Sequence, residues 1–188
     1  MKRLGLAVCG SFCTFDELLP QVESLAREYE ITPILSEAAN LTDTRFGLAA
    51  AFVKALRELC GREPITTIEA AEALGPKKLL DALAVAPCTG NTLAKLAAGI
   101  ADSTVTFACK AHLRNARPVV VAVSTNDGLA AAAKNLGALL NRKNYYFVPF
   151  GQDDPAGKPS SLKADLRLLG DTVAAALEGR QIQPILLK

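Results

Sequence analysis

One stretch of this sequence decides the fold: ALAVAPCTGNT, at residues 82–92. Its first six residues form an unbroken apolar run, which is typical of a strand buried on both faces of a parallel sheet. Its last residues, Gly90-Asn91-Thr92, combine a glycine with amide and hydroxyl groups, and a helix is expected at residues 91–101. Buried strands that alternate with helices in this way define the α/β class.

The same alternation continues in both directions along the chain. Further strands are expected at residues 4–9, 31–36, 64–67, 118–124 and 145–150, of which 64–67 is weak. Helices are expected between them. The last helix is expected to run from residue 160 or 161 to about 178, after an extended loop at residues 151–160. The sequence therefore predicts one three-layer α/β domain over residues 1–188.

Composition and charge exclude several classes of function. The chain has 188 residues, of which 50% are hydrophobic, so it can bury a core without disulfides or a structural metal. The formal net charge is only +2 and the basic residues are scattered, so a nucleic-acid interface is not expected. No apolar run approaches the roughly 20 residues of a membrane-spanning helix. The N-terminus lacks the pattern of a signal peptide, so a soluble cytoplasmic protein is expected.

The five cysteines are scattered and none is spaced C-x-x-C. This pattern predicts neither a zinc site nor a redox pair, and no metal is expected. The favoured interpretation is that the cysteines are small apolar residues of the core.

Small polar residues follow four of the expected strands. The strand ends read Cys9-Gly10-Ser11, Leu35-Ser36, residues 87–92 and Ser124-Thr125-Asn126-Asp127. In open parallel sheets, ligands bind beyond the carboxyl ends of the strands, where backbone N–H groups and helix dipoles attract anions. Any one of these residues alone is explained by helix capping, but together they predict a phosphate-bearing cofactor.

Two nucleotide-binding signatures are missing. The chain has no G-x-x-x-x-G-K-[ST] loop, and its Gly5-x-x-x-x-Gly10 spacing is not the G-x-G-x-x-G fingerprint. A nucleotide-dependent kinase and a self-sufficient nicotinamide enzyme of the usual type are therefore disfavoured.

Candidates for acid–base catalysis are few. His112 is the only histidine and lies inside an expected helix, where a surface or packing role is favoured over catalysis. No Ser–His–Asp or Cys–His pairing is indicated, so the catalytic residues stay unknown.

Charged residues near the expected ligand edge have alternative interpretations. Asp43 is favoured as a helix cap, whereas Arg45 is a candidate to pair with a carboxylate or phosphate. The pair Asp153-Asp154 is either a solvated turn or a site for a cation or a partner, and Lys158 and Lys163 partly offset its charge.

The chain resembles the flavoprotein family of FMN-dependent cysteine decarboxylases and flavin prenyltransferases. The resemblance rests on Gly10-Ser11, on Ser36, and on residues 86–95 leading to Gly99-Ile100-Ala101-Asp102. It implies a three-layer, Rossmann-like or flavodoxin-like fold with a six-stranded parallel sheet. It also implies a homo-oligomer whose FMN pocket is partly built by a neighbouring copy of the chain. By position, the residues implied in cofactor binding are Gly10, Ser11, Phe12, Ser36, Thr89, Gly90, Asn91, Thr92 and Thr125.

The chain departs from the decarboxylases at two places. Their catalytic histidine after the third strand has no counterpart in residues 60–74. Their Pro-x-Met-Asn block is replaced by Val123-Ser124-Thr125-Asn126-Asp127, which keeps only the asparagine. Both departures argue against cysteine decarboxylation by the mechanism of that family.

A narrower resemblance, within the same family, is to the flavoprotein-like component of a two-component oxidoreductase of spore-forming bacteria. It rests on residues 43–47, 74–78, 113–120, 122–127 and 146–155. It implies that a separate Rossmann-type protein binds NADP and that the pair oxidises a dihydropyridine dicarboxylate to the aromatic diacid. The groups expected to hold the two carboxylates are Arg45, Lys77 and Asn126.

Two other functions stay open at this point. One is a self-contained FMN-dependent decarboxylase or prenyl-transfer enzyme, against which the missing histidine argues. The other is an oligomeric scaffold or binding module whose pocket has lost its activity.

Overall fold

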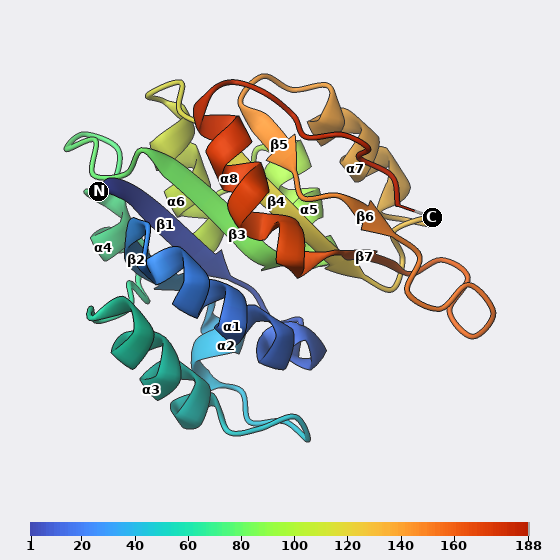
Figure 1. Cartoon of the computed structure of the whole chain (residues 1–188), viewed down its shortest axis with the longest axis horizontal. Helices are drawn as coiled ribbons and strands as arrows, with labels where there is room; N and C mark the ends of the chain where they lie inside the picture. The colour runs from blue at the N-terminus through green and yellow to red at the C-terminus, as the bar shows by residue number, and fades with distance from the viewer. Residues whose placement is uncertain (188) are drawn as a thin grey trace.

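Five parallel strands form the centre of the sheet in the computed structural model, which describes residues 1–187. Every residue of the third strand in the chain is buried, because strands lie on both its sides and helices cover both its faces (Figure 1). The apolar run at residues 82–87 therefore lies in the middle of the sheet, as predicted. The parallel strands, in the order β2-β1-β3-β4-β5, are β1 (Lys2–Val8), β2 (Tyr29–Leu35), β3 (Ala82–Cys88), β4 (Val119–Thr125) and β5 (Tyr145–Phe147).

Two short antiparallel strands complete the sheet. β6 (Phe150–Gly151) pairs with β7 (Leu162–Ala164), and β7 pairs with the last two residues of β4. The sheet is therefore mixed, and the expectation of six strands that all run parallel is wrong. The weak strand expected at residues 64–67 contributes only a bridge, between Ile34 and Ile65.

The last helix begins later than expected. Residues 162–164 alternate buried, half-buried and buried side chains, as a strand does, and they pair with β4 on one side and β6 on the other. A 3-10 turn, η2 (Leu166–Leu168), follows, and only then does α8 (Leu169–Leu177) begin. The predicted start at residue 160 or 161 is wrong because local composition does not reveal pairing with a strand far away in the sequence.

Helices cover both faces of the sheet (Figure 1). α1 (Phe15–Ala26) and α8 contact each other on one face, and α3 (Ala49–Cys60) packs against α1 and β2. The other face carries α4 (Ile68–Glu72), α5 (Gly90–Ala98), α6 (Thr104–Leu113) and α7 (Ala133–Leu140). Two short elements, η1 (Phe12–Thr14) and α2 (Glu37–Leu41), follow β1 and β2 at their carboxyl ends.

The interior of the three layers is aliphatic. Leu, Val, Ile and Ala dominate the buried side chains, which continue from β1 through β4. Cys9, Cys88 and Cys109 are buried, as expected for small apolar residues, whereas Cys13 is exposed and Cys60 is half-buried. Within residues 1–187, no helix is long and apolar enough to cross a bilayer.

Candidate functional site

A cleft of about 720 Å³ lies at the carboxyl ends of β1, β3 and β4. Its volume is within the range of small-molecule binding sites, roughly 300–1,000 Å³. Ligands of open parallel sheets bind at this position, beyond the carboxyl ends of the strands. Segments from five parts of the chain line it: residues 10–14, 45–46, 89–90, 124–126, and 153 with 158 and 161–163.

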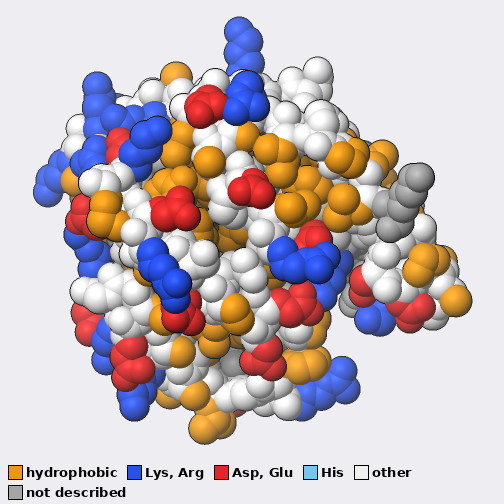
Figure 2. Space-filling model, in the orientation of Figure 1, with side chains coloured by type: hydrophobic (Ala, Val, Ile, Leu, Met, Phe, Trp, Pro, Cys, Tyr) orange, Lys and Arg blue, Asp and Glu red, His pale blue; other side chains and the backbone are white. Residues whose placement is uncertain are grey.

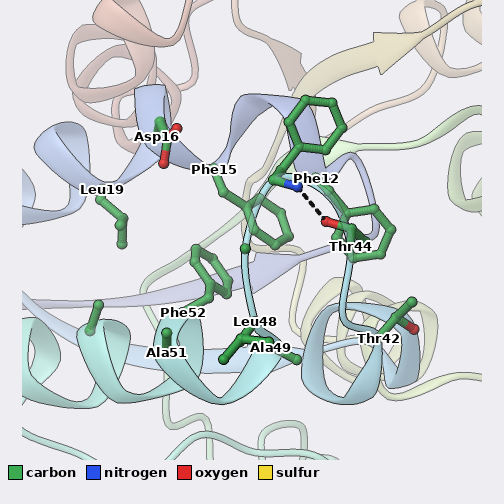
Figure 3. A pocket seen from close by; sticks show the side chains of 13 residues that line it. Phe12, Phe15, Asp16, Leu19, Thr42, Thr44, Leu48, Ala49, Ala51 and Phe52 are labelled. Atoms are coloured by element: carbon green, nitrogen blue, oxygen red, sulfur yellow. Dashed lines mark hydrogen bonds between the residues drawn. The ribbon is translucent and has the colours of Figure 1, made fainter.

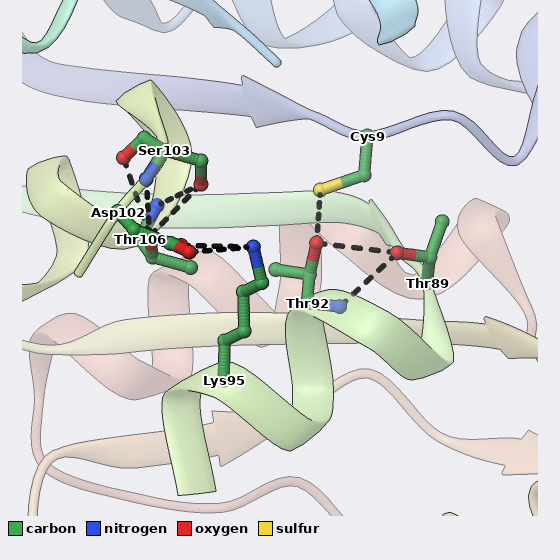
Figure 4. Close-up of polar contacts among 7 residues, drawn as sticks. All are labelled: Cys9, Thr89, Thr92, Lys95, Asp102, Ser103 and Thr106. Carbon is green, nitrogen blue, oxygen red and sulfur yellow. Dashed lines mark hydrogen bonds and ion pairs between the residues drawn. The ribbon is translucent and has the colours of Figure 1, made fainter. Parts of the chain in front are cut away.

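Side-chain hydrogen bonds fix the strand ends relative to one another. Ser11 after β1 and Ser124 in β4 share a hydrogen bond of 2.7 Å between their hydroxyl oxygens. In the turn after β3, the hydroxyl of Thr89 accepts from the backbone N–H of Thr92 at 3.3 Å and donates to the hydroxyl of Thr92 at 3.2 Å. Thr92 in turn donates to the sulfur of Cys9 at 3.2 Å (Figure 4). Three strand ends therefore form one connected polar floor.

The sulfur of Cys9 belongs to this floor as a neutral acceptor. Burial raises the pKa of the Cys9 thiol to about 11, so the thiol stays protonated at neutral pH. A protonated, buried thiol is a poor nucleophile. The position of Cys9 therefore favours a supporting role, as the acceptor of the Thr92 hydrogen bond.

The start of α5 needs a glycine. A Cβ atom on Gly90 would lie 2.5 Å from the hydroxyl oxygen of Thr125 and 2.8 Å from Oδ1 of Asp127. Both distances are too short for any side chain to be accommodated without movement. The backbone of α5 therefore approaches the end of β4 more closely than any other residue type allows.

This start of α5 has the donor groups that a phosphate requires. The N–H groups of Gly90 and Asn91 lie in the first turn of the helix, where no intrahelical acceptor exists, and the Thr89 hydroxyl is beside them. The residues present therefore fit the phosphate of a flavin mononucleotide. One feature opposes it: the carboxylate of Asp127 accepts a hydrogen bond of 2.5 Å from Thr125 and places a negative charge next to Gly90.

The mouth of the cleft is rich in cations. The guanidinium of Arg45 lies 4.9 Å from the centre of the Phe46 ring. Lys163 donates to Glu17 at 2.5 Å, so its charge is neutralised within the chain. The ammonium of Lys158 is 3.6 Å from a carboxylate oxygen of Asp153, which is too long for a hydrogen bond.

The structure brings most of the predicted residues into the cleft and leaves some outside it. Those that line it are Gly10, Ser11, Phe12, Arg45, Thr89, Gly90, Thr125 and Asn126. Thr92 is buried beneath it, Asn91 is exposed on the first turn of α5, and the hydroxyl of Ser36 caps α2 by accepting from Ala39 at 3.2 Å.

Lys77 does not lie with the other predicted residues. Lys77 is in the loop before β3. The backbone carbonyl of the neighbouring residue, Lys78, accepts a hydrogen bond from the guanidinium of Arg117. Asp81 at the end of the same loop bonds to Arg3 at the start of β1. The loop is therefore at the amino ends of the strands, opposite the cleft. Lys and Arg side chains are concentrated on the side of the molecule that carries the N-terminus (Figures 1 and 2).

Sequence reasoning missed the wall of the cleft formed by residues 158 and 161–163. It noted Lys158 and Lys163 only as neighbours of the Asp153-Asp154 pair. The alternation of Ser161, Leu162, Lys163 and Ala164 is a weak strand signal, and the same residues are equally compatible with the beginning of a helix. Phe46 was also missed as a cleft residue, because its place in the motif at residues 43–47 does not show that its ring lines the cleft.

A smaller cavity of about 190 Å³ adjoins the cleft (Figure 3). Its walls are aromatic: the rings of Phe15 and Phe52 stack with their centres 3.9 Å apart, and Phe12 packs edge-on against Phe15. Phe12 and Phe46 line both this cavity and the cleft.

The acidic residues for which the sequence left alternatives open each accept a hydrogen bond from a nearby residue of the chain. Asp43 is not the N-cap residue that was expected, because α3 begins only at Ala49 and its N-cap is Leu48. Asp43 instead accepts a hydrogen bond of 2.9 Å from the N–H of Ala49 across the preceding turn. Asp154 accepts from Gly157 at 2.8 Å in a turn. A hydrogen bond from Ser161 holds the pKa of Asp153 below its usual value.

His112 is a core residue. It is 1% exposed, its Nε2 lies 3.1 Å from the carbonyl oxygen of Pro118, and its Nδ1 has no partner among the described residues. Burial lowers its pKa to about 4, so it is neutral at physiological pH. It does not line the cleft, which confirms the packing role favoured from the sequence.

The mostly parallel sheet between helix layers, with a phosphate-compatible cleft at its carboxyl edge, defines an α/β protein with the flavoprotein fold. The sequence profile described as Flavoprotein matches residues 1–163. The B subunit of dipicolinate synthase from Bacillus subtilis (strain 168) is 46% identical over 188 residues, which are 100% of this chain and 94% of that protein. The chain therefore belongs to the flavoprotein family and, within it, groups with the B subunits of dipicolinate synthase.

Solved structures agree with this assignment. The crystal structure of the dipicolinate synthase B subunit from Bacillus halodurans C matches with a TM-score of 0.91 at 41% identity, over 100% of this chain and 96% of that chain. The FMN-dependent cysteine decarboxylase SpaF matches with a TM-score of 0.67 at 23% identity, over 94% and 97% of the two chains, and so shares the fold. Both the family and the narrower resemblance predicted from the motifs are confirmed.

Proposed function

We propose that this chain works with the Rossmann-type A subunit of dipicolinate synthase to oxidise dihydrodipicolinate to dipicolinate (pyridine-2,6-dicarboxylate), in the cytoplasm of the mother cell during spore formation. In this reaction a C–H bond of the dihydropyridine ring breaks and its hydride passes to NADP⁺. A proton leaves the ring as it becomes aromatic, so the products are the diacid, NADPH and H⁺. The nicotinamide is held by the Rossmann-type protein, since this chain lacks a dinucleotide fingerprint.

The observation that carries the proposal is the chemistry of the cleft. It presents hydroxyl and amide groups on its floor and the cations Arg45 and Lys158 at its mouth, which suits a dicarboxylate. It contains no histidine, because the one histidine of the chain is neutral and buried elsewhere. Binding and orienting the anion is therefore the part of the reaction that this chain is equipped to perform.

We also propose that the cleft binds FMN, with Thr89, Gly90 and Asn91 at the phosphate and Ser11 and Thr125 nearby, in a pocket that a neighbouring copy of the chain completes. When bound, a flavin supplies reversible two-electron chemistry. The fit of the first turn of α5 to a phosphate supports this proposal, as does membership of a family described as Flavoprotein. Asp127 weakens the fit without abolishing it.

The test is reconstitution with purified proteins. This chain, its Rossmann-type partner and the mixture of the two are each given the dihydro diacid and NADP⁺, and NADPH formation is followed. The proposal predicts full turnover only in the mixture. Full turnover by this chain alone indicates a self-contained enzyme instead. No gain in the mixture, together with a colourless protein that takes up no FMN, indicates a scaffold.

A further inference from the structure

Two cations that line the cleft lack a hydrogen-bonded acidic partner: Arg45 has no acidic partner among the described residues, and Lys158 has only a long ion pair with Asp153. Among the described residues that line the cleft, four carry charge: Arg45, Asp153, Lys158 and Lys163. Lys163 is neutralised by its short contact with Glu17. The other two cations belong to segments next to strands at opposite ends of the strand order. Arg45 lies after β2, the first strand in that order, and Lys158 lies between β6 and β7, the last two.

Arg45 is displayed on a preformed turn. The backbones of Thr44 and Gly47 exchange two hydrogen bonds of 3.0 and 3.1 Å, and the side chain of Asp43 holds the turn to the start of α3. No acidic side chain of the described residues lies within ion-pair distance of Arg45; its guanidinium rests over the Phe46 ring instead. The charge is therefore held in place but left available for an anion.

Lys158 is also presented by a structured loop. Its N–H donates to the carbonyl oxygen of Asp154 at 2.7 Å, and the Gln152 amide donates to the carbonyl oxygen of Pro159 at 2.8 Å. Asp153, the nearest acid, takes a hydrogen bond from Ser161 and leaves the Lys158 ammonium at 3.6 Å. An incoming carboxylate therefore competes at Lys158 only with this ion pair, which is longer than a hydrogen bond.

We propose that Arg45 and Lys158 form a two-point clamp for the two carboxylates of a pyridine-type dicarboxylic acid, and so determine the preference of the cleft for diacids over monoacids. Lys158 takes the place that the sequence analysis gave to Lys77. Asn126, which also lines the cleft, remains a neutral hydrogen-bond donor to the same ligand. The identity of the diacid rests on the proposed function, whereas the clamp itself is a property of the cleft.

The test compares two ligands on the purified full-length chain by calorimetric titration: pyridine-2,6-dicarboxylate and pyridine-2-carboxylate. Each of Arg45→Gln and Lys158→Gln is expected to weaken diacid binding about tenfold, the loss of one charge-assisted hydrogen bond to a carboxylate. The monoacid has a single carboxylate and cannot contact both cations at once. The ratio of the diacid affinity to the monoacid affinity is therefore expected to fall toward one in both variants. Arg45→Lys restores part of the loss at Arg45 because it keeps the charge but not the planar donor pair.

Two further variants, Lys134→Gln and Lys77→Gln, serve as controls for the loss of a lysine charge. Lys134→Gln changes an exposed lysine on α7 that does not line the cleft, and is expected to leave both affinities unchanged. The clamp is overturned if wild-type protein does not bind the diacid. It is also overturned if Arg45→Gln and Lys158→Gln act no more strongly than Lys134→Gln, or if Lys77→Gln is the variant that weakens binding.

The same variants separate the clamp from the proposed function. Absence of NADPH formation in the reconstituted pair contradicts the function, while the titration still decides the clamp. An active pair whose KM for the dihydro diacid is unchanged by Arg45→Gln and Lys158→Gln contradicts the clamp alone.

Discussion

Replacing Gly90 with alanine tests the geometry of the cleft floor. The new methyl group would lie 2.5 Å from the Thr125 hydroxyl and 2.8 Å from the Asp127 carboxylate. Thr125 cannot rotate away without losing its 2.5 Å hydrogen bond to Asp127, so either that bond breaks or α5 shifts away from β4. Overpacking of this kind costs about 1–3 kcal/mol of unfolding free energy.

The measurement is equilibrium unfolding in urea, with Gly137→Ala as the matched control. Gly137 lies on the exposed side of α7, and a Cβ there meets no atom within 4 Å. Alanine is therefore expected to stabilise the chain at that position by about 0.5–1 kcal/mol, through helix propensity alone. A Gly90→Ala variant as stable as Gly137→Ala would refute the close approach of α5 to β4.

Three further predictions concern single residues. Asp127→Asn keeps an acceptor for Thr125 but removes a negative charge beside the start of α5, so FMN affinity in a fluorescence titration is expected to rise about two- to fivefold; an unchanged or weaker affinity would contradict a phosphate site there. Asp43→Ala removes the hydrogen bond to the first N–H of α3 and should cost about 1 kcal/mol in urea unfolding; no loss would show that this hydrogen bond is dispensable. For His112, whose folded pKa of about 4 lies below its unfolded value, the stabilising effect of the neutral form is complete above about pH 6.5 and is lost as pH falls toward 4. Wild-type protein should therefore lose about 2 kcal/mol more stability between pH 7 and pH 5 than His112→Gln does, and equal losses would argue against a depressed pKa.

The parallel core was predictable because its signals are local. The apolar run at residues 82–87 is short and ends at glycine and hydroxyl residues, which favours a strand buried on both sides. The same glycine and hydroxyl residues indicate a ligand site at the carboxyl end of that strand. The groups at Ser11, Thr89 and Thr125 were located by the same rule, since each directly follows or ends a strand.

The antiparallel pair could not be predicted from local pattern. β6 has two residues and β7 has three, and both exist because they pair with partners distant in the sequence. Lys158 was missed as a cleft residue for the same reason, since its loop reaches the carboxyl end of β4 through the pairing of β7 with β4. Lys77 shows the opposite error: a motif suggested a site residue that the topology places at the other edge of the sheet.

The proposed role of this chain is tested most directly by the catalytic efficiency of the reconstituted pair when the clamp is removed from this chain alone. The Rossmann-type protein is combined with wild-type chain or with the Arg45→Gln/Lys158→Gln double variant, and kcat/KM for the dihydro diacid is measured as NADPH formation. If this cleft binds the substrate, two independent tenfold losses combine to about a hundredfold fall. An unchanged kcat/KM would show that the substrate binds elsewhere and would contradict the proposed function of the cleft.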